Sequence, residues 1–138
     1  MRPNGAILVV DDNPRLRELA KLALSAEGWD VGVESSRRAA LAVAARRAFA
    51  LALSDYAMPD GDGLLLLSEL KRLQPHCCLV LWSADLPAAE ASRAREIGVQ
   101  VLPDKVLGDK LCEVVRATLA PGGRAPGRLV TGEPGLRG

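Results

Sequence analysis

Residues 6–14 have the sequence AILVVDDNP, and this stretch decides the class of fold. Its first five residues are all apolar, which is typical of a strand covered on both faces in a parallel sheet. Asn13 and Pro14 then predict a helix start, with asparagine as the N-cap and proline at the first helical position. Leucine and alanine recur at helical spacing as far as Gly28, which we expect just beyond the helix end. The stretch therefore predicts a buried strand followed by a helix.

This unit is repeated along most of the chain. Short strand-like runs alternate with helical patterns five times before residue 120. Such alternation predicts a parallel sheet with helices on both faces, joined by right-handed crossovers. Five units are too few for the usual eight-stranded barrel, so we expect an open, doubly wound α/β sheet. We expect further strands at 29–34, 50–54, 78–83 and 99–102, helices at 36–47, 64–74, 86–98 and 108–120, loops at 56–63 and 103–105, and helix caps at Ser35 or Ser36 and at Asp85.

The composition predicts one globular domain followed by a tail. The chain has 138 residues, of which 49% are hydrophobic, enough for the core of a single domain. Residues 121–138 are rich in glycine, proline and arginine and lack apolar periodicity, so we expect a disordered tail after a domain at residues 1–120. The net charge of +1 argues against direct nucleic-acid binding. No apolar run suits a signal peptide or a membrane span, so we expect a cytoplasmic protein.

Polar side chains follow the ends of several predicted strands. Asp11 and Asp12 follow the first strand, Asp55 the third, and Ser83 and Lys105 the fourth and fifth. Because ligands bind outside the carboxyl ends of parallel strands, we expect these side chains to converge there. Three clustered carboxylates repel one another unless a cation is present, and hard oxygen ligands suit Mg²⁺. Asp55 is then the expected nucleophile for an aspartyl phosphate, with Lys105 and Ser83 contacting the phosphoryl oxygens.

These motifs resemble those of a known family. Residues 7–14, ILVVDDNP, resemble the opening of receiver domains of bacterial two-component response regulators. Residues 55–63, DYAMPDGDG, resemble the phosphoacceptor loop of that family, residues 82–84, WSA, its hydroxyl-bearing switch position, and Lys105 its active-site lysine. The resemblance covers about residues 6–120. Each motif alone is weak, but four motifs in the right order at the right strand ends are specific.

The resemblance implies a fold, a reaction and a set of site residues. The fold would be a three-layer (βα)5 sandwich with the flavodoxin-like strand order 2-1-3-4-5. The protein would be a signalling phosphoacceptor, not an enzyme, with at most self-catalysed phosphotransfer and slow self-dephosphorylation. Its phosphodonor would be a sensor histidine kinase or a phosphotransfer protein. In this reading Asp55 accepts the phosphoryl group, Asp12, Asp55 and the backbone carbonyl of Ala57 bind Mg²⁺ directly, Asp11 helps through water, and Ser83 and Lys105 hold the phosphoryl oxygens.

The resemblance also implies how phosphorylation would be communicated to another protein. Phosphorylation would reshape the surface formed by the helix at 86–98, the strand at 99–102 and the helix at 108–120, and a downstream protein target would read that change. We expect a monomer or a weak dimer. Two residues depart from the family pattern: Val106 follows the lysine where proline is usual, and Leu102 stands where an aromatic switch residue is frequent. These departures leave open a receiver-like protein-interaction module that works without phosphorylation.

Two alternative functions remain for this fold, and single residues argue against each of them. A flavodoxin-like cofactor binder would share the sheet, but Asp11 and Asp12 would repel a flavin phosphate where such a protein needs backbone N–H groups. A rapid aspartyl-phosphate hydrolase would need an acid–base residue at position 57, which is alanine. We assign Asp60 and Asp62 to the solvated loop at this stage, and Trp82 to core packing because strand alternation directs it away from Ser83.

Overall fold

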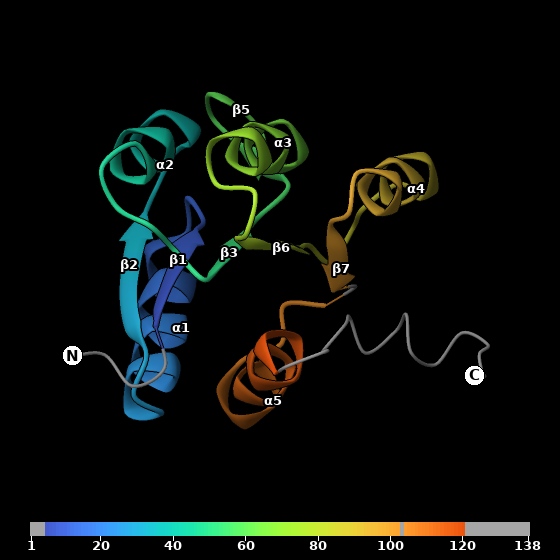
Figure 1. Ribbon diagram of the computed structural model, residues 1–138. Coiled ribbons are helices and arrows are strands. Elements are labelled where there is room, and N and C mark those ends of the chain that lie inside the picture. The colour runs from blue at the N-terminus through green and yellow to red at the C-terminus, as the bar shows by residue number, and fades with distance from the viewer. Residues whose placement is uncertain (1–4, 103, 121–138) are drawn as a thin grey trace.

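The computed structural model describes residues 5–102 and 104–120. Its centre is a five-stranded parallel sheet in the order β2-β1-β3-β6-β7 (Figure 1). This is the predicted doubly wound order, because β4 and β5 form a separate two-residue hairpin outside the sheet. The fold prediction is therefore confirmed. The strands are β1 (Ala6–Val10), β2 (Asp30–Glu34), β3 (Leu51–Ser54), β6 (Cys78–Trp82) and β7 (Gln100–Leu102).

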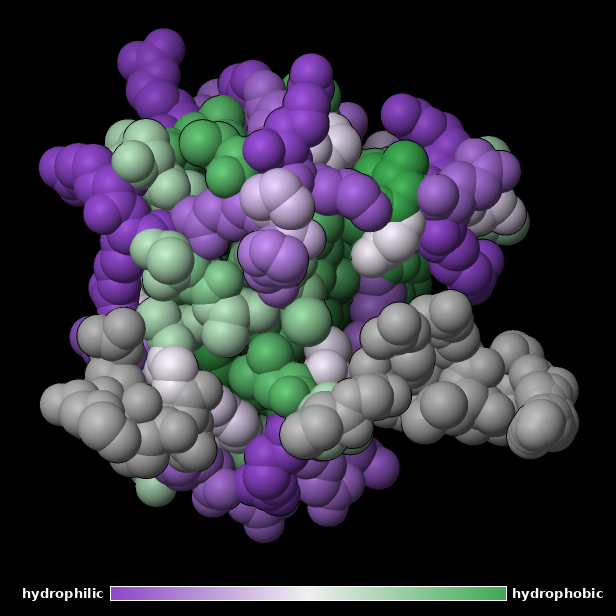
Figure 2. Space-filling model, viewed as in Figure 1, coloured by the Kyte–Doolittle hydropathy of each residue, from purple (hydrophilic) through white to green (hydrophobic). Residues whose placement is uncertain are grey.

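Five helices cover the two faces of the sheet. In Figure 1, α2, α3 and α4 lie above the sheet, and α1 and α5 lie below it. Figure 2 shows the same view, with hydrophilic residues mainly over the helices above and below and more hydrophobic residues across the middle. The helices are α1 (Pro14–Ala26), α2 (Arg37–Ala44), α3 (Gly63–Leu73), α4 (Ala88–Glu96) and α5 (Gly108–Leu119).

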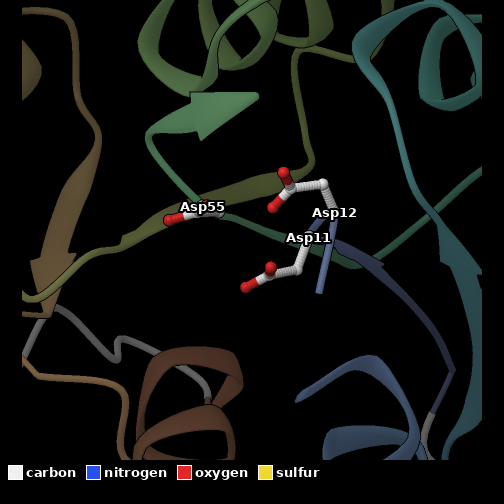
Figure 3. A group of neighbouring side chains, drawn as sticks. All are labelled: Asp11, Asp12 and Asp55. Atoms are coloured by element: carbon white, nitrogen blue, oxygen red, sulfur yellow. The ribbon is translucent and has the colours of Figure 1, made fainter. Parts of the chain in front are cut away.

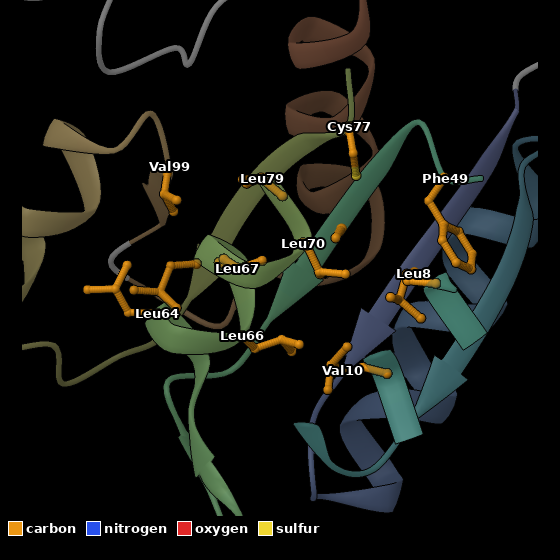
Figure 4. Packing of buried hydrophobic residues seen from close by; sticks show 14 of the residues in the cluster. Leu8, Val10, Phe49, Leu64, Leu66, Leu67, Leu70, Cys77, Leu79 and Val99 are labelled. Carbon is orange, nitrogen blue, oxygen red and sulfur yellow. The ribbon is translucent and has the colours of Figure 1, made fainter. Parts of the chain in front are cut away.

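The alternation of side chains along each strand produces two apolar clusters. Leu8 and Val10 of β1 belong to the cluster that contains residues of α2, α3 and α4 (Figure 4). Ile7 and Val9 belong to the cluster that contains residues of α1 and α5. All four side chains are fully buried. Burying one such side chain stabilises the fold by roughly 1.5–3 kcal/mol, so β1 is held firmly in the middle layer.

The first helix begins and ends as its sequence predicts. The Asn13 side chain accepts hydrogen bonds from the backbone N–H groups of Arg15 and Leu16, at 2.9 and 3.3 Å, and Pro14 is the first helical residue. Gly28 follows the helix with a φ of 99°, a conformation that glycine adopts without steric cost.

Two carboxylates that we assigned to the solvated loop have structural roles, so that assignment was incomplete. Asp62 is the N-cap of α3, and its side chain accepts from the N–H of Leu65 at 2.7 Å. Asp60 accepts from the N–H groups of Arg37 and Arg38 at the start of α2, both at 2.9 Å. The loop predicted at 56–63 also contains the hairpin of β4 (Ala57–Met58) and β5 (Gly61–Asp62). Both carboxylates fix this loop to helix N-termini, which always carry unpaired N–H groups.

The prediction of a helix cap at Asp85 is wrong. Helix α4 begins at Ala88, its N-cap position is Pro87, and no side chain caps it. Helix α2 is capped by Ser36, one of the two predicted serines, and it ends at Ala44, earlier than predicted.

Among the described residues, no helix is long and apolar enough to cross a bilayer. The predicted tail at 121–138 lies outside the described residues, as does Pro103 of the predicted loop at 103–105.

Candidate functional site

Three carboxylates meet at the carboxyl edge of the sheet. Asp11 and Asp12 follow β1, and Asp55 follows the neighbouring strand β3. One oxygen from each of the three carboxylates lies within 4.8 Å of the other two (Figure 3). The donor set consists of hard oxygen atoms only, and such a set suits a divalent cation of the Mg²⁺ type.

Asp11 is the most deeply buried member of this cluster, with 1% of its surface exposed. Its Oδ1 accepts from the backbone N–H of Asn13 at 2.9 Å, and its Oδ2 accepts from Lys105 Nζ at 2.6 Å. A guanidinium N–H of Arg17 donates to the Asp11 backbone carbonyl at 2.7 Å. Both sides of this carboxylate are thus satisfied, as a buried charge requires.

Lys105 contacts a carboxylate that follows β1 and another that follows β3. Its ammonium donates to Asp11 Oδ2 at 2.6 Å and to Asp55 Oδ1 at 2.9 Å. Three carboxylates and one ammonium leave two negative charges in this group of side chains. Because close like charges destabilise one another, that excess is the amount a single divalent cation would neutralise.

The environment of Asp55 opposes its ionised form. Burial raises the pKa of the Asp55 carboxyl, the ammonium of Lys105 lowers it in part, and the charge of Asp11 raises it further. The balance keeps the pKa above the usual aspartate value. A cation beside the cluster would act in the opposite direction and favour the nucleophilic carboxylate.

The main chain of Asp55 is held on several sides. Its N–H donates to the carbonyl of Val10 on β1, and its carbonyl accepts from the Ser54 hydroxyl, both at 2.9 Å. Gly63 approaches so closely that a Cβ atom there would lie 1.9 Å from the Asp55 carbonyl oxygen. Only glycine fits at this position without movement of the backbone. The sequence showed the glycine but gave no sign of this contact or of the Ser54 hydrogen bond.

Two of the remaining predicted residues, Ala57 and Ser83, follow β3 and β6, which are neighbours in the sheet. Ser83 follows β6 and is 7% exposed, and its N–H donates to the Leu102 carbonyl at 3.3 Å. Within residues 5–102 and 104–120 its hydroxyl makes no hydrogen bond. Ala57, whose carbonyl is the predicted metal ligand, is exposed at the start of β4, two residues after Asp55. Leu102 is buried in the apolar cluster under α1 and α5.

Trp82 has a contact that the sequence did not predict. It is fully buried in the apolar cluster beneath α1 and α5, as expected for a core residue. Its ring also lies under the ammonium of Lys105, with Nζ 4.5 Å from the ring centroid. Strand alternation places the indole on the face opposite Ser83, but it could not reveal that Lys105 reaches back over that ring.

Most of this chain, including the acidic cluster and the shared lysine, matches a known protein family. Residues 7–116 match the family described as the response regulator receiver domain. This chain belongs to that family. The match covers all the carboxylates and the lysine described above, and it confirms the family that the motifs indicated.

Curated relatives of this receiver domain are larger regulators. The chain is 33% identical over 93 residues to the transcriptional regulatory protein GlrR of Escherichia coli, which covers 67% of the chain and 21% of GlrR. It is 30% identical over 126 residues to the DNA-binding transcriptional regulator NtrC of Rhizobium meliloti, which covers 91% of the chain and 26% of NtrC. The chain thus spans about a quarter or less of the length of these two relatives.

Solved receiver structures share the fold. A CheY-like receiver domain protein from Methanospirillum hungatei has a TM-score of 0.76 and 26% identity, over 83% of this chain and 92% of that one. The response regulator TrrA from Thermotoga maritima, solved in complex with Mg(2+)-BeF, has a TM-score of 0.69 and 28% identity, over 80% and 96% of the two chains.

Proposed function

We propose that this receiver domain accepts a phosphoryl group on Asp55 from the phosphohistidine of a sensor histidine kinase or phosphotransfer protein. The observation that carries the proposal is the position of the Asp55 carboxylate. It lies within a cluster of three acids and shares one lysine with Asp11. A carboxylate in such a place would lie beside a bound cation and lies beside the positive charge of Lys105, and phosphoryl transfer needs both.

The acidic cluster would hold Mg²⁺. Asp12, Asp55 and the Ala57 carbonyl would contact the ion, with Asp11 acting through water. When bound, Mg²⁺ supplies positive charge that neutralises the phosphoryl oxygens. The complex of TrrA with Mg(2+)-BeF supports this assignment, because that protein shares the fold with this chain at 28% identity.

The residues of the chain itself would carry out the transfer. An oxygen of Asp55 attacks the phosphorus, the P–N bond of the phosphohistidine breaks, and its electron pair returns to the imidazole nitrogen. Lys105, which contacts Asp55 Oδ1 in the structure, would turn toward a phosphoryl oxygen. The Ser83 hydroxyl, which has no partner among the described residues, would donate to another. Most of the catalysis would come from positioning and charge neutralisation.

The output would follow from these movements. Ser83 and Lys105 lie at the ends of β6 and β7, so their displacement would reach α4, β7 and α5. A downstream protein target would bind that altered surface. We further propose that the receiver domain spans residues 1–120 and acts in the cytoplasm as a monomer or weak dimer.

Intact-protein mass spectrometry tests the proposal directly. With acetyl phosphate and Mg²⁺, the wild-type chain is expected to gain one phosphoryl group, and Asp55→Asn is expected to gain none. Chelation of the Mg²⁺ should also abolish the adduct. Asp62→Asn is the matched control, since asparagine is as good an N-cap as aspartate, and it should be modified like the wild type.

Two results would contradict the proposal. An adduct that persists in Asp55→Asn would place the phosphoryl group on another residue. The absence of any adduct on the folded wild-type chain would favour the phosphorylation-independent interaction module.

A further inference from the structure

The loop that carries Lys105 lacks the usual means of fixing a loop before a helix. Lys105 is followed by Val106, where proline is usual in the family, so the main chain gains no rigidity from a proline ring at this position. The N-cap of α5 is Leu107, which makes no side-chain hydrogen bond to the helix. The lysine nevertheless lies within hydrogen-bonding distance of two carboxylates. Some other contact must hold this loop.

Trp82 contacts this loop at two successive residues. Its indole N–H donates to the backbone carbonyl of Val106 at 3.2 Å. The face of the same ring lies 4.5 Å from Lys105 Nζ. The ring itself is fully buried at the end of β6, so its own position is fixed by packing. One rigid side chain thus restrains both the main chain of the loop and the charged end of its lysine.

The contact with the aromatic ring suits a lysine that must keep an N–H donor for a phosphoryl oxygen. An aromatic face attracts an ammonium through its quadrupole and takes none of its hydrogen bonds, and tryptophan is the strongest such partner. Lysine has three N–H donors, and the structure directs two of them to Asp11 and Asp55. The ring therefore holds the charge in place and leaves a donor for an incoming phosphoryl oxygen.

We propose that Trp82 is a positioning residue for Lys105, and that its indole takes the place of proline in fixing the Lys105–Val106 loop. Its effect on phosphoryl transfer rests on the function proposed above, whereas the contact itself does not. Trp82 would touch neither the metal nor the phosphoryl group. It would act only through the lysine.

The second tryptophan provides a matched control. Trp29 is also buried in the apolar cluster beneath α1 and α5, at 6% exposure. It immediately precedes the edge strand β2, whereas Trp82 ends β6, from which β2 is separated by β1 and β3. Replacing either residue by phenylalanine removes an indole from the same cluster. Only Trp82→Phe also removes the hydrogen bond to the loop and weakens the contact with the ammonium.

The first test compares the rates of modification by acetyl phosphate with the affinities for Mg²⁺. Trp82→Phe should lower the rate about tenfold, as expected for the loss of one hydrogen bond and part of a cation–π contact. Its Mg²⁺ affinity, measured by calorimetric titration, should stay within about twofold of wild type, because the substitution keeps every proposed metal ligand and the charge of Lys105. Trp29→Phe should leave both values unchanged. A wild-type rate in Trp82→Phe, or an equal loss in both variants, would overturn the proposal.

The second test needs no phosphodonor and no Trp82 variant. In Trp29→Phe, Trp82 is the remaining tryptophan, and its fluorescence reports on the charge above its ring. Adding Lys105→Met should shift that emission, whereas Lys110→Met, at an exposed lysine of α5, should not. An emission unchanged by Lys105→Met would refute the contact. If the wild-type chain takes no phosphoryl group, the proposed function fails, while this emission still decides whether Trp82 contacts Lys105.

Discussion

The first three helices and the last two begin in different ways. Asn13, Ser36 and Asp62 cap α1, α2 and α3 with side-chain hydrogen bonds. Helices α4 and α5 have Pro87 and Leu107 at the same position, and neither makes such a bond. Helix α4 also buries only one of its nine residues, whereas α3 buries five of eleven.

The two groups of helices follow different parts of the site. The capped helices adjoin the segments that carry Asp11, Asp12 and Asp55, so local hydrogen bonds fix the acidic cluster. The uncapped helices adjoin Ser83 and Lys105, which are positioned by contacts across the molecule. A segment with few local restraints and little burial opens at lower cost than one with many. In the part of the domain expected to respond to phosphorylation, both helices therefore lack a side-chain cap, and α4 is also little buried, whereas α5 buries four of its twelve residues.

The largest expected difference between the capped and the uncapped helices concerns Gly63 and Gly108, the first residues of α3 and α5. A Cβ at Gly63 would lie 1.9 Å from the Asp55 carbonyl oxygen, whereas a Cβ at Gly108 would meet nothing within 4 Å. Gly63→Ala should lower the free energy of unfolding by about 3 kcal/mol or more, since backbone must move. Gly108 has a φ of 60°, so Gly108→Ala should cost only about 1–2 kcal/mol of conformational strain.

Urea denaturation of the two alanine variants measures this difference. Equal losses of stability would contradict the proposed difference in restraint. They would mean that the β3–α3 junction tolerates movement as readily as the start of α5. Modification of Gly63→Ala by acetyl phosphate should also be slower, since the variant displaces the main chain of Asp55.

Much of this architecture could be predicted from sequence because its signals are local. The apolar run at residues 6–10 and the cap at Asn13 specified β1 and α1 without further information. The open parallel sheet and the convergence of the acids followed from the rules of parallel sheets, whereas the order of the strands followed from the family resemblance. Asp85 was a wrong cap because the same residue type also occurs in ordinary turns, and only the path of the chain decides between them.

The rest depended on contacts between residues distant in the chain. Lys105 lies 94 positions from Asp11 and 50 from Asp55. No spacing in the sequence indicates that Trp82 lies beneath that lysine or that Asp60 reaches the start of α2. The residue types were visible, but their partners follow from the packing of the helices on the sheet.

The next effect concerns the capping of α3. Asp62→Ala should cost about 1 kcal/mol, because the N–H of Leu65 loses its partner. Amide hydrogen exchange in the first turn of α3 should then rise toward the rates in the first turn of α5. Asp62→Asn preserves the cap and should exchange like wild type. Asp109→Ala, an exposed acid in the first turn of α5, should change the stability by less than about 0.5 kcal/mol.

The smallest effect is a pH dependence at Asp60, which ties the acceptor loop to α2. Hydrogen bonds from the backbone N–H groups of Arg38 and Arg37 lower the pKa of the Asp60 carboxyl. A group with a lowered pKa in the folded state stabilises the fold above its unfolded pKa of about 3.9, and that contribution disappears as the pH falls through the folded value.

The difference in unfolding free energy between wild type and Asp60→Ala should therefore be present at pH 7 and shrink as the pH falls below about 4. Asp60→Asn does not titrate there, so its difference from Asp60→Ala should stay constant over the same range. Denaturation curves at several pH values measure both differences. A wild-type advantage over Asp60→Ala that is independent of pH would mean that the carboxylate charge adds nothing at this junction. Asp60 would then restrain the acceptor loop through hydrogen bonds to Arg37 and Arg38 that do not depend on its charge.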